Sequence, residues 1–510
     1  MTLQRRATLL TGAVVFAVLY LVARPLAVGA VQDDGIYMVL ARALATGEGY
    51  RYIHLPGMPH ATHYPPGYPA LLAILWRLWP SFPENVALFQ LANVLCAAVA
   101  AGVLVSLATR AGLSVRAGVA VALAGSLMLP ALVVVSPLMS EPLWLAITLP
   151  LLLAADRWLA EGTPGELATA ALLGAWTAAS ALVRTQSVVI LAVLVLLLAS
   201  RRRWRDAVAA GAAGTILLLP WYVWVRAHRS ELPPMLEGKY GSYAAWLVDG
   251  WAAAGPALFA VSARRNLGDI VSLLGWVTAP PGAPGVVIAL LSAAVVALLL
   301  WGSLALWRRM PVLVAFTWLY LAIVVVWPFP PHRFLWSVWP LLVLLVAAGA
   351  RAAAAVLAPQ GRRPLRLAAA GLALLVVAGA AIHTAQAYRR RTFETYQATG
   401  LYRLQSAVRW VAEHTPPGAL VASDDETAVF LYTGRRAVPT DAFLAVTRMT
   451  EGDAAVPSAL PRIVATYQPA FVVAGWRRTI RAADALAAAR PPTLVRVSTL
   501  SPGVAYARIP

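Results

Sequence analysis

Residues 31–50, VQDDGIYMVLARALATGEGY, follow the first long apolar run of the chain and place two adjacent carboxylates, Asp33 and Asp34, just beyond it. From Ile36 onward, apolar residues recur with the i, i+3, i+4, i+7 spacing of an amphipathic helix, and the pattern stops at Gly47. A helix of this kind beside a membrane is expected to lie along the bilayer surface. The stretch therefore predicts a juxtamembrane helix over 35–46 with an acidic pair at its start.

The composition is that of a membrane protein. Of the 510 residues, 60% are hydrophobic and 12% are charged, whereas soluble domains carry about 25% charged residues. The formal charge of +19 comes from arginines scattered among apolar runs, with no basic stripe of the kind that binds nucleic acid, so we expect no nucleic-acid partner. The single cysteine, Cys96, rules out an intrachain disulfide.

The apolar runs predict the number of membrane crossings, because a helix needs about 20 apolar residues to cross a ~30 Å hydrocarbon core. The arginines at 110–116, 201–205, 308–309 and 351–366 mark cytoplasmic loops, and these four groups fall on one side if the N-terminus is cytoplasmic. The first run lacks a signal-peptide cleavage pattern, so we expect an uncleaved helix. Eleven runs predict a polytopic plasma (inner) membrane protein: 7–24, 84–108, 117–136, 141–160, 166–183, 185–200, 206–225, 284–306, 311–328, 334–350 and 366–383.

The same topology places 25–83, 226–283 and the tail after about 384 outside the membrane. In the tail, LYRLQSAVRWVAEHTPPG (401–418) has helical spacing, and ALVAS, AFVVAG and TLVRVS are typical of short buried strands. SDDET (423–427) is interpreted as a helix cap after a strand. We therefore expect a transmembrane domain over 1–383, with a second juxtamembrane helix at 67–79, and a small extracytoplasmic α/β domain over 384–510.

Two roles are open for the acidic pair. One carboxylate can cap the helix, accepting a hydrogen bond from an exposed N–H and complementing the helix dipole. Only one residue can occupy that position, so if Asp34 caps, Asp33 is left as a free carboxylate that suits a general base for an acceptor hydroxyl. Such a reaction with a phosphate leaving group needs one carboxylate and nearby cations, whereas a glycosidase needs two facing carboxylates.

Asp33-Asp34-Gly35-Ile36-Tyr37 resembles the D-[DE]-x-x-Y motif in the first outer loop of GT-C superfamily glycosyltransferases, multi-pass enzymes that use polyprenyl-phosphate sugars. The resemblance covers nearly the whole chain, includes the C-terminal domain, and is strongest to bacterial protein-mannosyltransferase and lipid A aminoarabinose-transferase types. Further stretches similar to the family's motifs follow in its order: GEGYRY (47–52), HYPPGYPALLAIL (63–75), SEPLW (140–144), ALVRTQSV (181–188) and HRFLWSVWPLLVLL (332–345).

The resemblance implies that Asp33 is the catalytic base and Asp34 its acidic neighbour, with Tyr37 completing the motif. Aminoarabinose-type members carry a lysine before the Pro-Pro pair, where this chain has His63, so a charge at that position would depend on pH. The implied activity is inverting transfer of a sugar from a polyprenyl-phosphate donor to the hydroxyl of a lipid, glycan or protein acceptor at the outer face of the membrane.

An anionic lipid phosphate needs cationic or N–H donors near the membrane interface. For the arginines and His332 the alternative is a side chain that extends to the interface without a catalytic role, and for the only lysine it is a solvated loop residue. The candidates to bind the phosphate are Arg184, His63, Arg333 with its neighbour His332, and Lys239.

His54, His60 and His63 raise the question of a zinc site. Their spacing fits no compact ligand motif such as H-E-x-x-H, so we predict no metal ligands, although a divalent ion held by acidic residues stays open. Glu141 follows Ser140 at the start of an apolar run, and it either caps that helix or contacts a metal or the acceptor. The chain has no Gly-rich phosphate loop, which argues against a nucleotide-sugar donor.

Two other classes of protein are alternatives to a glycosyltransferase. A lipid or sugar transporter would show repeated halves, broken helices with polar groups near the midplane, and a polar cavity on each side. The sequence shows no internal repeat, and its motif residues gather on the predicted outer side. A membrane-assembly protein that uses the tail as a binding module would not need the acidic pair.

Overall fold

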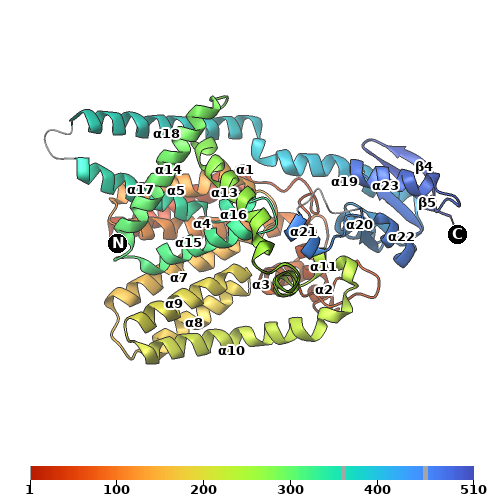
Figure 1. Cartoon of the computed structure of the whole chain (residues 1–510), viewed down its shortest axis with the longest axis horizontal. Helices are drawn as coiled ribbons and strands as arrows, with labels where there is room; N and C mark the ends of the chain where they lie inside the picture. Colours follow the sequence, from red (N-terminus) through yellow and green to blue (C-terminus); the bar gives the residue numbers. More distant parts are fainter. Residues whose placement is uncertain (1, 358–362, 452–457, 510) are drawn as a thin grey trace.

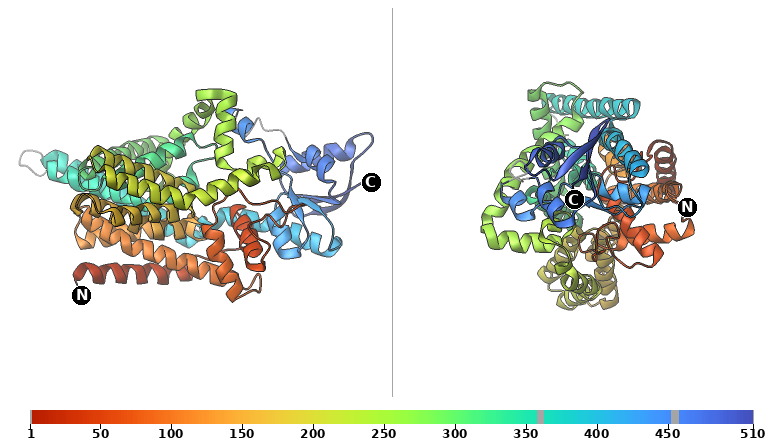
Figure 2. Two further views of the ribbon diagram at one scale, coloured as in Figure 1. Left: turned by 90° about the horizontal axis from the view of Figure 1, so that it is seen from below. Right: turned by 90° about the vertical axis from the view of Figure 1, so that its right-hand side faces the viewer.

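The computed structural model describes residues 2–357, 363–451 and 458–509. The molecule is elongated, with a helix bundle at one end and a small α/β domain at the other (Figure 1). The N-terminus lies at the end of the bundle that is far from the α/β domain (Figure 1). Viewed down the long axis, the α/β domain stands in front of the bundle, and α1 runs along the edge of the bundle (Figure 2).

Within the part of the chain that the structure describes, thirteen helices build the bundle. They pack closely where small residues meet: a Cβ at Gly302 would lie 2.0 Å from the Leu345 carbonyl oxygen, and one at Gly349 would lie 2.0 Å from that of Leu298. The helices are α1 (Leu3–Val22), α4 (Val86–Arg110), α5 (Val115–Leu127), α6 (Leu129–Val135), α7 (Glu141–Glu161), α8 (Leu167–Ala181), α9 (Val188–Ser200), α10 (Trp204–His228), α13 (Ala260–Thr278), α14 (Gly285–Leu306), α15 (Pro311–Val326), α17 (Trp339–Leu357) and α18 (Arg363–Arg390).

The fold is the predicted α-helical membrane protein with a small α/β domain. Within the described residues, eight helical segments are long and apolar enough to cross a membrane, or nine when the bent pair α5 and α6 counts as one span. Seven of the eight segments, and the bent pair, coincide with predicted spans. The remaining three predicted spans, 166–183, 185–200 and 311–328, correspond to the shorter apolar helices α8, α9 and α15.

The eighth long segment, Tyr243–Thr278, lies inside 226–283, which the sequence analysis treated as a loop. It contains α12 (Tyr243–Ala254), the 3-10 turn Gly255–Phe259 and α13. Arg264, Arg265 and Asp269 interrupt the apolar pattern of α13, which is why no span was predicted there. The described helix packs against the bundle, where Asn266 donates hydrogen bonds to carbonyl oxygens at the end of α15.

The first predicted outer loop forms two helices close to the predicted ranges, α2 (Asp33–Thr46) and α3 (Gly67–Leu78). The prediction that α2 has a single apolar face is wrong, because nearly every residue from Asp34 to Ala43 is buried. Helix α3 covers one side, and α20 (Glu426–Thr433) of the α/β domain packs against another. Gly35 permits this contact, since a Cβ there would lie 2.2 Å from Thr427 Oγ1. The α/β domain therefore helps to hold α2 in place.

The α/β domain begins with α19 (Thr395–His414), after α18 has continued past the predicted boundary at residue 383. Its sheet has the order β2-β1-β3-β5-β4, with β1, β2 and β3 parallel and with β5 antiparallel to both β3 and β4. The three predicted strands are present as β1, β3 and β4, whereas β2 and β5 were missed because they are short or rich in small residues. The elements are β1 (Val421–Ser423), β2 (Ala437–Pro439), α21 (Ala445–Glu451), α22 (Leu460–Tyr467), β3 (Phe471–Ala474), α23 (Arg477–Ala488), β4 (Leu494–Leu500) and β5 (Gly503–Arg508).

Replacing Gly35→Ala tests the contact between α2 and α20. The added methyl group overlaps Thr427, and overpacking of this kind costs about 1–3 kcal/mol, so we expect a lower thermal midpoint in detergent. The matched control is Gly268→Ala in α13, where an added Cβ meets no atom within 4 Å. Equal midpoints for the two variants would contradict the close packing of the α/β domain on α2.

Candidate functional site

A cavity of about 1000 Å³ lies between the helix bundle and the α/β domain. It brings together five predicted site residues that are far apart in the sequence: Asp33, His63, Lys239, His332 and Arg333. Its apolar wall includes Val133, Val134, Pro137, Met139, Trp246, Trp327, Phe329, Phe334 and Trp336. Its polar wall includes the five predicted residues together with Arg403, Asp425, Glu426, Asp441 and Arg478 of the α/β domain.

Asp33 is the member of the acidic pair that lines the cavity. Its Oδ2 accepts a hydrogen bond from Arg333 Nη1 at 2.6 Å, and its Oδ1 accepts one from the Tyr64 hydroxyl at 2.8 Å. Burial opposes ionisation of Asp33, but the Arg333 guanidinium and the Tyr64 hydroxyl outweigh it and lower the pKa of the carboxyl. Asp33 is therefore ionised at neutral pH. The sequence suggested a free carboxylate, whereas in the structure Asp33 is paired with Arg333.

Asp34 has a different role in the structure. Its carboxylate accepts hydrogen bonds from the backbone N–H groups of Gly29, Val31 and Gly35 at 3.0, 3.2 and 2.9 Å, and so fixes the turn before α2. Neither carboxylate is the expected cap, because Gln32 occupies the N-cap position and makes no side-chain cap bond. Burial raises the pKa of Asp34 to about 7 despite these hydrogen bonds. Asp34 is fully buried behind the cavity wall.

Arg333 connects Asp33 to Glu141. Arg333 lies on the short helix α16 (His332–Ser337), and its Nε donates to Glu141 Oε1 at 2.8 Å. The same oxygen lies 2.8 Å from Arg184 Nη1. Glu141 begins α7 and Arg184 lies between α8 and the 3-10 turn Thr185–Ser187, so the four side chains alternate in charge across separate elements. We call Asp33, Arg333, Glu141 and Arg184 the charge row.

The charge row leaves one buried acceptor unused. Glu141 Oε2 is buried and has no hydrogen-bond partner within the part of the chain that the structure describes. Arg184 is 6% exposed and does not line the cavity, so its charge is directed at Glu141. Tyr37 joins the row indirectly, because its hydroxyl lies 3.1 Å from Ser140 Oγ, to which Arg184 Nη1 donates at 3.2 Å.

His63 lines the cavity without supplying a positive charge. Its Nδ1 lies 2.5 Å from the Gly241 carbonyl oxygen, and its ring packs against Tyr243 and Trp246. Burial lowers the pKa of His63 to about 4, so the ring is neutral at pH 7 and Nδ1 donates to that carbonyl. His63 therefore carries no positive charge near neutral pH in this structure, and the expectation of a pH-dependent charge at a bound lipid phosphate stays a prediction. His332, also on the cavity wall, is exposed.

Lys239 is not a solvated loop lysine. It is 6% exposed, and its Nζ lies 2.7 Å from Asp441 Oδ1 and 2.9 Å from Glu426 Oε1. Burial disfavours the ammonium group, but Asp441 and Glu426 outweigh burial and raise the pKa of Lys239. Its charge therefore ties α11 (Glu237–Tyr240), in the second predicted loop, to the α/β domain across the cavity.

SDDET (423–427), which we expected to be a helix cap, contributes to the cavity wall, and this role was not predicted from the sequence. Asp425 is at the N-cap of α20 but makes no cap bond, and it accepts instead from Arg403 Nε at 2.8 Å. Asp424 accepts from Thr479 Oγ1 at 2.6 Å, and Glu426 from the Tyr240 hydroxyl at 2.5 Å. Their position in the sequence could have indicated this role. The three acidic residues directly follow β1, and binding sites in α/β sheets lie at the carboxyl ends of parallel strands.

One group in the described residues has the spacing of metal ligands: His60, His228 and Glu231, whose ligand atoms all lie within 4.8 Å of one another. Glu231 accepts from both rings, at 2.8 Å from His60 Nδ1 and 2.7 Å from His228 Nδ1. The three histidines of the first loop do not meet, since His54 contacts Tyr240 and His63 contacts Gly241.

The pKa of Asp34 gives a test of its structural role. Because the folded pKa is raised above the ordinary value, the folded protein keeps a proton that the unfolded chain releases between about pH 4 and pH 7. The contribution of Asp34 to stability therefore falls as pH rises through this window. We expect the thermal midpoint of wild type minus that of Asp34→Asn to decrease from pH 4 to pH 7, and a constant difference would contradict this assignment.

Comparison with known proteins places the fold. No protein-family profile matches the sequence, and no curated protein matches it. The structure of ArnT from Cupriavidus metallidurans in the apo state is similar, with a TM-score of 0.53 and 14% identity over 98% of this chain and 97% of that chain. The structure of the same protein bound to undecaprenyl phosphate gives 0.50 and 15% over the same shares. The chain therefore has an ArnT-like fold across both the bundle and the α/β domain.

Proposed function

We propose that this protein is an inverting glycosyltransferase that moves a sugar from a polyprenyl-phosphate donor to an acceptor hydroxyl. The observation that carries the proposal is Asp33, which begins the Asp-Asp-x-x-Tyr stretch, lines a cavity with one apolar and one polar wall, and is paired with Arg333. The full-length likeness to ArnT supports it, because one of the ArnT structures is bound to undecaprenyl phosphate.

The two walls of the cavity match the two parts of such a donor. The prenyl chain lies along the apolar wall, where α6 and the aromatic residues around Trp327 offer a surface without charges. The phosphate meets Arg333, whose planar guanidinium suits phosphate oxygens. The sugar and the acceptor then occupy the space between Asp33 and the polar residues of the α/β domain. A lipid, glycan or protein can supply the acceptor hydroxyl.

Asp33 supplies the base in this reaction. It takes the proton of the acceptor hydroxyl while the oxygen forms a bond to the anomeric carbon of the sugar. The bond between that carbon and the phosphate oxygen breaks, and polyprenyl phosphate leaves with the electron pair. Attack opposite to the leaving group inverts the anomeric configuration. The leaving phosphate needs no proton, so one carboxylate and one guanidinium suffice for the step.

Arg333 couples donor binding to the strength of the base. In the described structure Arg333 contacts both Asp33 and Glu141. When a phosphate competes for the guanidinium, Asp33 loses part of the interaction that lowers its pKa, and it becomes a better proton acceptor. Glu141 keeps Arg333 in position during this exchange, because it remains bonded to Arg333 Nε on the far side of the row.

We propose that the protein lies in the plasma membrane with its N-terminus in the cytoplasm and its α/β domain outside. The arginine distribution between apolar runs supports this orientation. Lateral diffusion in the bilayer then delivers the donor to the cavity, and the acceptor arrives from the side of the α/β domain.

A transporter is the alternative, and a second cavity does lie at the opposite end of the bundle. The two cavities share no lining residue. Along α7 between them, Trp144, Leu149 and Leu152 are fully buried, and the hydroxyl groups of Thr148 and Ser180 bond to each other at 2.7 Å. A packed segment of this kind favours a transferase with one site near the α/β domain over a carrier with a midplane site.

Asp33→Asn tests the base directly. General bases contribute about 10²–10⁴-fold to rate, so we expect sugar transfer, or slow donor hydrolysis, from a panel of short-chain polyprenyl-phosphate sugars to fall by at least about 10²-fold. The measurement is product formation by the purified chain in detergent. Asp249→Asn is the matched control, because Asp249 is exposed and lies outside the cavity lining. Transfer that survives in Asp33→Asn would refute the assignment of the base.

Arg333→Gln tests the coupling between the guanidinium and Asp33. Loss of the cation removes the main influence that lowers the pKa of Asp33, while burial still raises it. Transfer requires the ionised carboxylate, so we expect the acid limb of kcat/KM to move to higher pH in the variant. Arg390→Gln, at the exposed end of α18, is the control for charge loss. If the acid limb of the kcat/KM profile stays at the wild-type pH, Arg333 does not lower the pKa of Asp33.

A further inference from the structure

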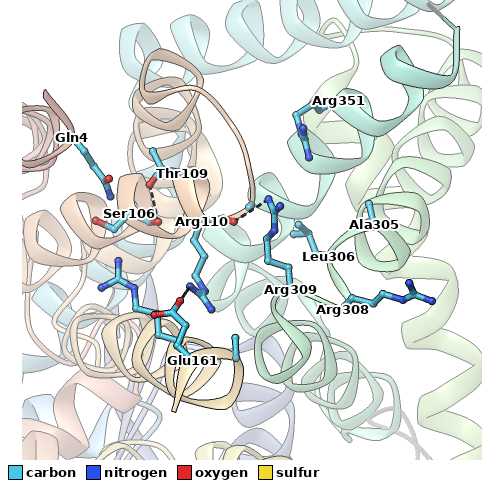
Figure 3. A pocket seen from close by; sticks show the side chains of 13 residues that line it. Gln4, Ser106, Thr109, Arg110, Glu161, Ala305, Leu306, Arg308, Arg309 and Arg351 are labelled. Atoms are coloured by element: carbon cyan, nitrogen blue, oxygen red, sulfur yellow. Dashed lines mark hydrogen bonds and ion pairs between the residues drawn. The ribbon is translucent and has the colours of Figure 1, made fainter. Parts of the chain in front are cut away.

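The end of the bundle opposite the α/β domain contains a second cavity, of about 920 Å³. Five arginines line it, and Figure 3 shows four of their side chains with labels. They come from α4, α7 and α17 and from the turn after α14: Arg110, Arg157, Arg351, Arg308 and Arg309. Glu161 is the only acidic residue among the described residues of the lining.

The charges in this cavity are not balanced. Glu161 pairs with Arg110 at 2.8 Å, and this carboxylate is itself 69% exposed. Among the described residues, no ion pair involves Arg157, Arg308, Arg309 or Arg351. The site near the α/β domain differs in this respect, because there every guanidinium of the charge row faces a carboxylate.

Two of these guanidiniums, those of Arg309 and Arg351, approach each other, and neither pairs with a carboxylate of the described residues. A Cβ at Gly112 would lie 2.7 Å from Arg309 Nη1 and 3.0 Å from Arg351 Nη2. Each distance is 3.0 Å or less, so the two nitrogens lie no more than about 6 Å apart, where like charges repel. Figure 3 shows the two side chains pointing toward one another. A phosphate that accepts from both groups relieves this repulsion and uses the fork geometry of arginine.

The positive-inside tendency explains why arginines occur at this end of the bundle, but it does not require them to meet in one hollow. Other arginines at this end of the bundle do not enter the cavity. Arg202 lies on the turn before α10 and Arg205 in its first turn, and both are exposed and outside the cavity lining. Convergence of five arginines from four separate segments is typical of a site for an anionic group.

The surface beside the cavity indicates where such an anion comes from. Helix α14 carries an exposed apolar face that leads directly to Arg308: Leu300, Trp301, Leu304 and Trp307 are 49%, 44%, 78% and 47% exposed. An acyl chain can lie along this face while its headgroup reaches the arginines, and tryptophan is the residue favoured at the boundary between hydrocarbon and headgroups. Basic pockets between membrane helices bind anionic headgroups in this way.

We propose that the arginine cavity binds the phosphate of an anionic phospholipid headgroup, with the acyl chains packed along α14. The site is separate from the cavity that holds Asp33. It connects the ends of α4, α7, α14 and α17, so its occupation stabilises the bundle at the end that has no α/β domain.

The experiment measures the thermal midpoint of the full chain in detergent as phosphatidylglycerol is added, with phosphatidylcholine as the zwitterionic comparison. We expect phosphatidylglycerol alone to raise the midpoint, and the apparent Kd for it to weaken by about tenfold or more in the double variant Arg309→Gln, Arg351→Gln, because charge-assisted hydrogen bonds are lost. The matched control is Arg202→Gln, Arg205→Gln, which removes the same charge outside the cavity and is expected to keep the wild-type response.

Each other outcome overturns part of the proposal. Equal weakening in both double variants would show diffuse charge attraction and no site, and an unchanged response in Arg309→Gln, Arg351→Gln would do the same. A midpoint shift of the same size with glycerol 3-phosphate would keep the phosphate site but refute the lipid as its source. If the double variant does not fold, Arg157→Gln gives the same test, because Arg157 is exposed and makes no ion pair with the described residues.

Discussion

The charge row is the interaction on which the site depends. Asp33, Arg333, Glu141 and Arg184 belong to α2, α16, α7 and the junction after α8, which approach one another only in the folded chain. Removing a charge from water costs several kcal/mol, and well-aligned partners must offset that cost. Because every member of the row has an opposite charge within 2.8 Å, no one of these elements can shift without leaving another charge unpaired.

The charge row also explains why Asp33, at its exposed end, is ionised. Arg184 and Glu141 are buried, whereas Asp33 and Arg333 keep 24% and 26% of their side-chain surface exposed toward the cavity. The inner pair fixes the position of Arg333, and Arg333 in turn keeps Asp33 ionised. In the proposed reaction, the base and the cation are therefore held in position by Glu141 and Arg184, two residues outside the cavity lining. Asp34, adjacent in sequence, has the different task of fixing the turn that starts α2.

Some parts of this arrangement could be predicted from the sequence, and others could not. Long apolar runs predicted most of the bundle. Of the candidates for phosphate binding, Arg333, His63, His332 and Lys239 line the same cavity as Asp33, whereas Arg184 lies outside its lining. The sequence could not predict that His63 is neutral or that Lys239 is paired, because burial and partners from distant segments decide both. Helix α13 was not predicted, because its charged residues interrupt the apolar pattern. The place of Asp424 to Glu426 in the cavity wall was not predicted, because the same acidic stretch after a strand is also typical of a helix cap.

Binding of a lipid phosphate at Arg333 is the central proposal, and its most direct test is an experimental structure of the full chain with a short-chain polyprenyl phosphate. We expect the phosphate in the cavity between the bundle and the α/β domain, hydrogen-bonded to Arg333, with the contact between Arg333 and Asp33 opened. A phosphate bound only among the arginines at the opposite end of the bundle, with Arg333 still paired to Asp33, would contradict it.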